Sequence, residues 1–402
     1  MPSEELVKYS LHNLEHRLGR SSLTILSIFV GITTIFVFIS FGLGLYNFVD
    51  AYSTGSSVDK FTVMQKGAGV PGLDESFAIT EKDLDAVKKT AGVFDATGMY
   101  AKAAEVKQDK TKKYVFLIGY EPDKPILFDV SGIKIKEGRA LRPGDKGKVV
   151  VGYNYAVKNK IFPKAYSVNQ KIEIQGRDYR IIGIYEPIGN PQDDSQIYLT
   201  NDDFRELYGS NLKGYMMLMG RLDKSIINTA IKRIESSLRD SRDIKVGKED
   251  FFVQSFQDLI ATYSKVLQGI AAFVILIAML SVLVSAINTA NTMITSVMER
   301  TREIGVMKAV GARNSEVFRI FLFESALLGF VAGIFGVLAG YGISALAGNF
   351  LASIGWSIFK PYFSFWLFFN LVLFATLTGA ISGAIPAYQA SRVSPVKALR
   401  YE

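Results

Sequence analysis

Residues 23–46 read LTILSIFVGITTIFVFISFGLGLY, an apolar run without a charged residue. An α-helix needs roughly 20 such residues to cross the hydrocarbon core of a bilayer, so this run predicts a transmembrane helix. A long polar segment follows, and none of the apolar runs alternates as the strands of a membrane β-barrel do. Three further apolar runs of similar length lie beyond that segment, at Val266–Met293, Val317–Ala347 and Tyr362–Ile385.

These runs predict the fold class: a membrane α-helical protein with four transmembrane helices and a large extracytoplasmic α+β domain inserted between helices 1 and 2. Along the 402 residues we expect the following parts, by number: a cytoplasmic amphipathic N-terminal helix (1–20), helix 1 (21–49), the extracytoplasmic domain (50–264), helix 2 (265–297), a cytoplasmic coupling-helix loop (298–315), helix 3 (316–347), an outer loop (348–361), helix 4 (362–386) and a cytoplasmic tail (387–402).

The basic residues set the predicted orientation. The net charge is +8, and the basic side chains gather before helix 1, between helices 2 and 3 and after helix 4. Cytoplasmic flanks carry this excess, so we expect both termini and the 2–3 loop inside a multi-pass cell membrane protein. The placement argues against nucleic-acid binding. The first run is too long for a cleaved signal peptide, which indicates an uncleaved signal anchor.

The inserted segment mixes strand and helix patterns, and we expect an α/β lobe built from both of its ends with a β-rich insert at about 135–200. Thr80 is a predicted cap for a helix that reaches Thr90, and a second helix is expected over Ser225–Leu238. The expected strands are Lys60–Gln65, Lys113–Gly119, Lys148–Val151, Lys171–Ile174, Tyr179–Tyr185, Gln196–Leu199, Tyr215–Gly220 and Asp243–Val246.

No catalytic constellation is found in the sequence. Cysteine is absent, which excludes thiolate chemistry and disulfides. The only histidines, His12 and His16, have a spacing that can hold a metal, but without a third ligand nearby the expectation is two interfacial side chains and no metal site. Asp193 and Asp194 are expected to be solvated loop carboxylates. We therefore do not expect an enzyme.

The most informative short segment is Met298–Gly311, MERTREIGVMKAVG, between helices 2 and 3. Ile304, Met307 and Val310 are expected on one side of a short helix, with charged residues around them and Gly311 at its end. Such a helix can dock into a groove on a soluble partner. The alternative from spacing alone is a solvated basic loop that only sets the topology.

Several strings resemble the MacB/FtsX-type ABC transporter permeases, in motif order and over nearly the whole chain. They are Glu299-Arg300, Arg302-Glu303-Ile304-Gly305, Lys308-Ala309-Val310-Gly311-Ala312, the C-terminal Pro386–Glu402, and, in the inserted segment, Gly138-Arg139, Val149-Val150-Val151-Gly152 and Tyr179-Arg180-Ile181-Ile182-Gly183.

The resemblance implies a permease that works as a dimer with a cytoplasmic ABC ATPase. Its coupling helix would be residues 299–311. No phosphate-loop motif occurs, so ATP and Mg would be bound by a partner chain, as in the permease-only branch of the family. An identical second subunit and a related one both stay open, as does an extracytoplasmic cargo or adaptor. The implied ATPase-coupling residues are Glu299, Arg300, Arg302, Glu303, Ile304, Gly305, Met307, Lys308 and Gly311.

Within the membrane, small residues predict close helix packing, inside one subunit or between two. They are Gly329, Gly333, Gly336 and Gly340 on helix 3 and Gly379 and Gly383 on helix 4. A polar stripe on helix 2 either binds neighbouring helices or lines a polar path; it comprises Ser281, Ser285, Asn288, Thr292 and Thr295.

Glu324 is an ionisable residue in helix 3 and needs a partner there. The expected partner is a base of the coupling helix, such as Arg302 or Lys308, or hydrogen bonds from Asn288 or Asn291. A clamp between helices 2 and 3 and a direct mechanistic role are both open.

The family resemblance implies mechanotransmission: ATPase motion moves the outer domain, for export or extraction of peptides, lipoproteins or hydrophobic drugs. The alternative is a signalling scaffold that controls an extracytoplasmic cell-wall enzyme or an antimicrobial response.

Overall fold

The computed structural model describes residues 18–53, 59–66 and 78–400. They form two compact units, which are considered separately. The helical unit comprises the chain up to Leu45 with Val266–Phe350 and Phe359–Glu402, and the inserted domain comprises Tyr46–Lys265 with Leu351–Ile358. The predicted N-terminal amphipathic helix, including His12 and His16, lies almost wholly outside the described residues.

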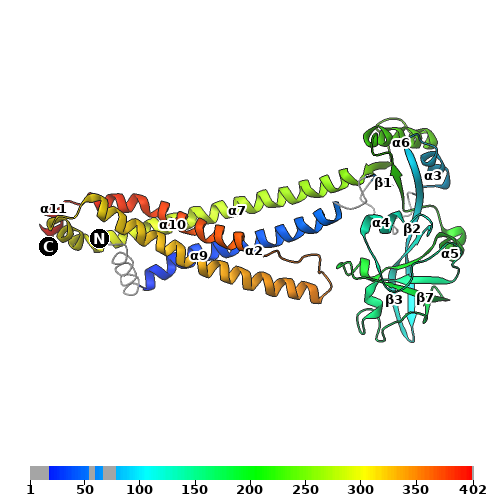
Figure 1. The fold of residues 1–402 in the computed structure, drawn as a ribbon, viewed down its shortest axis with the longest axis horizontal. Coiled ribbons are helices and arrows are strands. Elements are labelled where there is room, and N and C mark those ends of the chain that lie inside the picture. The colour runs from blue at the N-terminus through cyan, green and yellow to red at the C-terminus, as the bar shows by residue number, and fades with distance from the viewer. Residues whose placement is uncertain (1–17, 54–58, 67–77, 401–402) are drawn as a thin grey trace. The chain divides into compact units, whose positions relative to one another are not determined.

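Four helices in the described part of the chain are long and apolar enough to cross a membrane. Figure 1 shows them side by side. This confirms the four predicted transmembrane helices, although each extends beyond its apolar run. They are α2 (Leu18–Ser53), α7 (Phe256–Glu299), α9 (Asn314–Ser353) and α10 (Phe365–Ser391).

Helix α9 is the most enclosed of the four, and its glycines explain why. A Cβ on Gly329 would collide with the carbonyl oxygen of Ala375 in α10, and one on Gly340 would lie 2.8 Å from the Cβ of Phe36 in α2. Gly333 likewise faces α10, and Gly336 faces α2. Gly379 and Gly383 of α10 lie against Ser325 of α9. The small residues therefore pack helices within one chain, which answers the question left open by the sequence.

Polar side chains join α2 to α7. The hydroxyls of Thr24 and Thr292 lie 2.7 Å apart, and the Asn288 amide donates to Ser27 Oγ at 3.3 Å. Further along, Ser281 packs against Gly31. Such hydrogen bonds hold helices together in lipid. The polar stripe of α7 thus contacts a neighbouring helix of the same chain.

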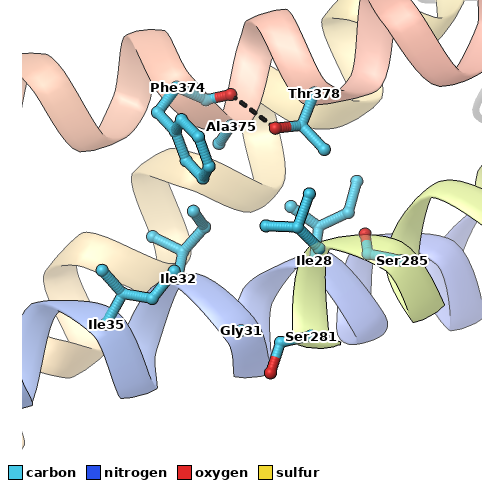
Figure 2. Close-up of a pocket in the computed structure, with 10 residues that line it drawn as sticks. Ile28, Gly31, Ile32, Ile35, Ser281, Ser285, Phe374, Ala375 and Thr378 are labelled. Carbon is cyan, nitrogen blue, oxygen red and sulfur yellow. Dashed lines mark hydrogen bonds between the residues drawn. The ribbon is translucent and has the colours of Figure 1, made fainter. Parts of the chain in front are cut away.

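Figure 2 shows where α2, α7 and α10 meet, with Ile28, Ile32 and Ile35 of α2 pointing toward Phe374. The cavity enclosed here has a volume of about 10 Å³. That is at most the space of one water molecule. Beside it, the same three helices line a larger groove of about 800 Å³, between side chains such as Ile39, Met279 and Leu371.

The inserted domain is built on one ten-stranded sheet in the order β10-β1-β9-β2-β3-β8-β5-β7-β4, with β6 paired to β2 and β7. The strands are β1 (Lys60–Gln65), β2 (Val93–Gln108), β3 (Thr111–Tyr120), β4 (Ile135–Gly138), β5 (Lys148–Val151), β6 (Lys171–Ile174), β7 (Arg177–Tyr185), β8 (Ile197–Thr200), β9 (Met217–Leu222) and β10 (Phe251–Ser255). The sequence did not predict β2, whose first half pairs with β9 and whose second half pairs with β3.

The two faces of the sheet are covered unequally. Three helices pack their apolar sides into the larger core: α3 (Glu81–Lys88), α5 (Asn201–Tyr208) and α6 (Ile227–Arg242). Thr80 caps α3 with a reciprocal capping box, as predicted. The second, smaller core is covered by the short α4 (Ile126–Ser131), through Leu127 and Phe128.

One predicted strand, Asp243–Val246, is wrong. Asp243 has a φ of +53° and ends α6, and Lys248 closes a turn by donating to the Lys245 carbonyl at 3.0 Å. A left-handed residue followed by a turn interrupts the extended backbone that a strand needs. The strand that follows α6 is β10, and α7 begins directly after it.

The Gly138-Arg139 motif has a structural role in this domain. Gly138 has a φ of +78°, and the Arg139 guanidinium donates to both carboxylate oxygens of Asp145 at 2.6 and 3.0 Å. These bonds, with a further one from Lys148, hold the pKa of Asp145 well below its usual range. The carboxylate in turn accepts a bond from the Arg142 amide and fixes the loop before β5.

Two glycines of α9 provide a matched test of the packing. We expect Gly329→Ala to destabilise the helical unit by about 1–3 kcal/mol, since the new Cβ meets the Ala375 backbone. Gly342→Ala should be neutral or stabilising by up to about 1 kcal/mol, because its Cβ meets nothing within 4 Å and alanine is the better helix former. Thermal unfolding of the detergent-purified chain measures both; equal shifts would contradict the packing.

Candidate functional site

The predicted coupling segment forms a separate short helix, α8 (Thr301–Ala309). The chain leaves α7 at Arg300, whose φ of −109° and ψ of 14° break the helix. At the other end Gly311 has a φ of +111°, its amide donates to the Lys308 carbonyl, and the Ala312 amide donates to the Met307 carbonyl at 3.0 Å. This pair of bonds is a Schellman motif, in which glycine is the residue that adopts positive φ without strain.

Ile304 anchors α8 to the helical unit. Its side chain is completely buried in a cluster with Met293 of α7 and Val317 and Phe321 of α9. The expectation that Ile304 shares an outward apolar side with Met307 and Val310 is therefore wrong. Val310 is 85% exposed, and Met307 is partly exposed, between the values of Ile304 and Val310. Gly305 is buried. Burial of Ile304 holds the helix in place, and a different set of side chains faces outward.

A buried ion pair ties the start of α8 to α9. Arg300 and Glu324 are 4% and 7% exposed, and their Nη1 and Oε2 atoms lie 3.2 Å apart. The Arg300 Nε also donates to Glu303 at 3.0 Å, and the guanidinium lies over the Phe321 ring. Arg300 was expected among the charged residues around the apolar side of this helix; instead its position at the helix break turns it inward.

The predicted kind of partner for Glu324, a base of the coupling segment, is confirmed, but the base is Arg300 instead of Arg302 or Lys308. Lys308 donates to the carbonyl oxygens of Ser391 and Val393 at 2.8 Å each, at the end of α10. Asn288 donates to Ser27, and Arg302 and Asn291 are exposed. A lysine bound to the last carbonyls of a helix also interacts favourably with the helix dipole. Lys308 therefore joins α8 to α10.

The outward side of α8 borders a groove of about 430 Å³. Val306 is 48% and Val310 85% exposed, and Glu299, Arg302 and Glu303 are exposed nearby. We call the exposed side chains of Arg302, Glu303, Val306 and Val310 the α8 surface. Exposed apolar side chains rimmed by charges are typical of an interaction site. The groove is lined by Val306, Met307, Val310, Ala312, Glu316, Val317, Arg319 and Ile320.

Comparison with known proteins gives two family matches that together cover most of the chain. The MacB-like periplasmic core domain matches residues 21–239, and the FtsX-like permease C-terminal domain matches residues 275–395. The ABC transporter permease MJ1507 of Methanocaldococcus jannaschii is 30% identical over 100% of this chain and 99% of its own length. The chain belongs to the MacB/FtsX family of ABC transporter permeases.

Two further relatives, compared by sequence, agree with this assignment. YknZ of Bacillus subtilis, an ABC transporter permease, is 27% identical over 97% of this chain and 96% of its own. The macrolide export ATP-binding/permease protein MacB of Mannheimia succiniciproducens is 27% identical over 95% of this chain, which spans 59% of that protein. The solved periplasmic region of MacB from Actinobacillus actinomycetemcomitans aligns with 52% of this chain and 94% of its own at 16% identity, with a TM-score of 0.41.

The permease is therefore a membrane protein with an extracytoplasmic α+β domain inserted after its first transmembrane helix. Its α8 lies within the FtsX-like match. Sequence reasoning placed α8 correctly and expected a base of this segment beside Glu324, but it did not identify that base as Arg300 and missed the groove beside Glu316 and Arg319. No local pattern connects Arg300 with Glu324, since they belong to different helices.

In the inserted domain, the expectation of solvated carboxylates is wrong for Asp194, while Asp193 is half-buried. Asp194 is 4% exposed and accepts the amides of Ile188 and Gly189 at 2.6 and 3.1 Å. Asp193 accepts the side-chain amides of Asn190 and Gln196 at 2.9 Å each. Burial raises the pKa of both carboxyls, and for Asp193 the neighbouring charge of Asp194 raises it further. Among the described residues no group of three or more metal-ligating side chains occurs.

The buried Arg300–Glu324 pair predicts that the double variant loses less stability than the two single variants lose together. Arg300→Met and Glu324→Leu should each destabilise the fold by about 3 kcal/mol, because each removes one half of the buried ion pair. The double variant should be closer to wild type than the sum of the two. Unfolding of the detergent-purified chain measures all three.

The exposed pair Lys164–Asp109, with side chains 73% and 68% exposed, is the control. Lys164→Met should change stability by less than about 1 kcal/mol. Additive effects at Arg300 and Glu324 would show that they do not act as a pair.

Proposed function

We propose that this permease couples ATP hydrolysis by a separate cytoplasmic ATPase to movement of its extracytoplasmic domain. The α8 surface is the proposed docking point for the ATPase, which binds ATP and Mg in its own chain. The observation that carries the proposal is the construction of α8. It is fixed to α7 and α9 by Ile304 and Arg300 and to α10 by Lys308, while Val306 and Val310 remain exposed.

A helix held in this way transmits displacement to the helices it joins instead of absorbing it. A push on Val306 or Val310 would reach α9 through the Arg300–Glu324 pair and α10 through Lys308. Packed interfaces of this kind move as rigid bodies or shift between discrete arrangements. Three separate attachments therefore support α8 as a lever.

The junction between α7 and the inserted domain supports transmission outward. The chain passes from β10 at Ser255 to α7 at Phe256 without a linker. Ser255 caps the helix: its Oγ accepts the Asp258 amide at 3.1 Å and donates to the Asp258 carboxylate at 2.6 Å. A capped, linker-free junction has few dihedral angles free to absorb motion.

We propose mechanotransmission rather than passage of a polar solute through the helical unit. The small cavity where α2, α7 and α10 meet has a volume of about 10 Å³, and the groove of about 800 Å³ beside it is lined by apolar side chains apart from Asn370. The proposed cargoes are molecules handled outside the membrane or at its outer face: peptides, lipoproteins or hydrophobic drugs. The relative MacB is named for macrolide export, which supports the last class.

A second permease subunit is the proposed partner within the membrane. In the most apolar window of α7 only 11% of the residues are buried, and Phe273, Leu276 and Leu280 are more than 60% exposed. Such a surface faces either lipid or another subunit. We propose an identical copy. The permease itself carries no catalytic role in this proposal.

The proposed orientation places α8 and both termini in the cytoplasm, as the positive flanks indicate. The absence of cysteine allows a direct test with two exposed valines, Val246 in the inserted domain (80% exposed) and Val310 beside α8 (85% exposed). A membrane-impermeant maleimide should label Val246→Cys in intact cells and Val310→Cys only in inside-out vesicles. Labelling of Val310→Cys in intact cells, with Val246→Cys protected, would reverse the topology and remove the basis of the proposal.

ATPase docking is tested at Val310. Val310→Asp should reduce co-purification of the cognate ATPase at least tenfold and abolish stimulation of its ATP turnover by the permease, since a charge replaces an exposed apolar contact. Combined charge reversal at Glu299 and Glu303 should have the same effect.

The control is Val246→Asp, an equally exposed valine in the inserted domain. It should leave the amount of bound ATPase unchanged. If Val310→Asp and the Glu299/Glu303 reversal both retain the ATPase at the wild-type level, α8 is not the docking point.

A further inference from the structure

The second face of the inserted domain's sheet is only partly covered. Helix α4 packs over one part of it through Leu127 and Phe128. Beyond α4, the described residues of this face line a cavity of about 460 Å³. Met99 and Ala101 of β2, Phe116 and Ile118 of β3 and Tyr198 of β8 supply most of its floor, and Phe48 near the end of α2 borders it. This volume lies within the usual range of small-molecule sites, about 300–1,000 Å³.

One end of the cavity is polar and acidic. Gln192, Asp193 and Gln196 line it. Both carboxylate oxygens of Asp193 accept hydrogen bonds from neutral amides, those of Asn190 and Gln196. Among the residues that the structure describes, no lysine or arginine pairs with Asp193. The adjacent Asp194 is buried and adds a second negative charge at the same end.

An apolar cavity that ends in a carboxylate without a cationic partner is complementary to one kind of molecule. We propose that this cavity binds a hydrophobic organic cation, a compact apolar body bearing one protonated amine, with Asp193 as its counter-charge. The inference deepens the proposed function by naming a ligand class for it, as cargo or as a molecule that is sensed. The role of the ligand as cargo or signal rests on the proposed function, whereas its binding to the cavity does not.

Other ligand classes fit less well. An anion would be repelled by Asp193 and by Asp194, whose charge Lys160 offsets in part, and an uncharged apolar ligand would gain nothing from the carboxylate. A metal ion would find these two carboxylates but no third ligand of His, Cys, Asp or Glu within the described ranges. Burial and the charge of Asp194 raise the pKa of Asp193, and a bound cation would offset that electrostatic cost.

Hydrogen bonds within the loop that carries Asp193 hold this side chain in place at the end of the cavity. Asp194 accepts two backbone amides of the same loop, and Ser195 Oγ donates to the Pro191 carbonyl at 2.6 Å while accepting the Asn154 amide at 2.9 Å. The Ile358 amide donates to the Gly189 carbonyl at 3.2 Å. A carboxylate on such a constrained loop loses little conformational entropy when a ligand binds.

The test uses the full-length, detergent-purified permease without its ATPase. The probe is dansylcadaverine, a fluorescent hydrophobic amine, and its N-acetylated form is the uncharged equivalent. Saturable fluorescence enhancement should be seen with the amine and should be at least tenfold weaker in affinity for the acetylated form. Asp193→Asn should weaken binding of the amine by roughly ten- to a hundredfold, the range expected for loss of a charge-assisted hydrogen bond.

Asp178→Asn is the matched control, since Asp178 lies on the β6–β7 hairpin with its side chain 59% exposed. It should bind the amine as the wild type does. Ala101→Trp fills the cavity without touching Asp193 and should abolish binding of the amine. If thermal unfolding shows that Asp193→Asn does not fold, binding of the amine by Ala101→Trp is the test of the inference.

Equal affinity for the amine and its acetylated form would overturn the inference. So would unchanged binding of the amine by folded Asp193→Asn or by Ala101→Trp. Because no ATPase is present, these results are independent of the Val310→Asp test, and failure of one leaves the other standing.

Discussion

The buried contact between Arg300 and Glu324 connects the part of the permease that we assign to the ATPase with the part that spans the membrane. Two opposite charges in an enclosed, weakly polar region are stable only together, because each alone would carry the full cost of its lost hydration. Arg300 lies at the break between α7 and α8, and Glu324 lies within α9. The pair therefore fixes the direction in which the chain turns at Arg300, and Ile304 fills the space that this turn creates.

Close packing of the helical unit depends on a different constraint. Lipid provides no hydrophobic drive for helices to associate, so they associate where backbones approach closely or where polar side chains pair. Gly329 and Gly340 allow α9 to contact α10 and α2, and Thr24 and Asn288 pair α2 with α7. Together with the attachments of α8 to α7, α9 and α10, these contacts hold the helices of the unit against one another.

The inserted domain has unequal sheet faces, and this inequality has a functional consequence. The face covered by α3, α5 and α6 is a complete core. The opposite face has only α4 over it and retains an open cavity with Asp193 at one end. A domain that moves under ATPase control and also presents a ligand cavity would link binding to motion without a channel.

The sequence by itself determined the membrane spans, the insertion of the domain, most strands and the position of α8, because each of these depends on a local pattern: apolar length, alternation, a capping residue or a glycine. It did not determine β2, since Val93–Gln108 owes its extended form to pairing with β9 and β3. Nor did it determine the partner of Glu324, the inward direction of Ile304 or the burial of Asp194. These were decided by tertiary structure, because burial and ion pairing join residues that the folded chain brings together from different elements.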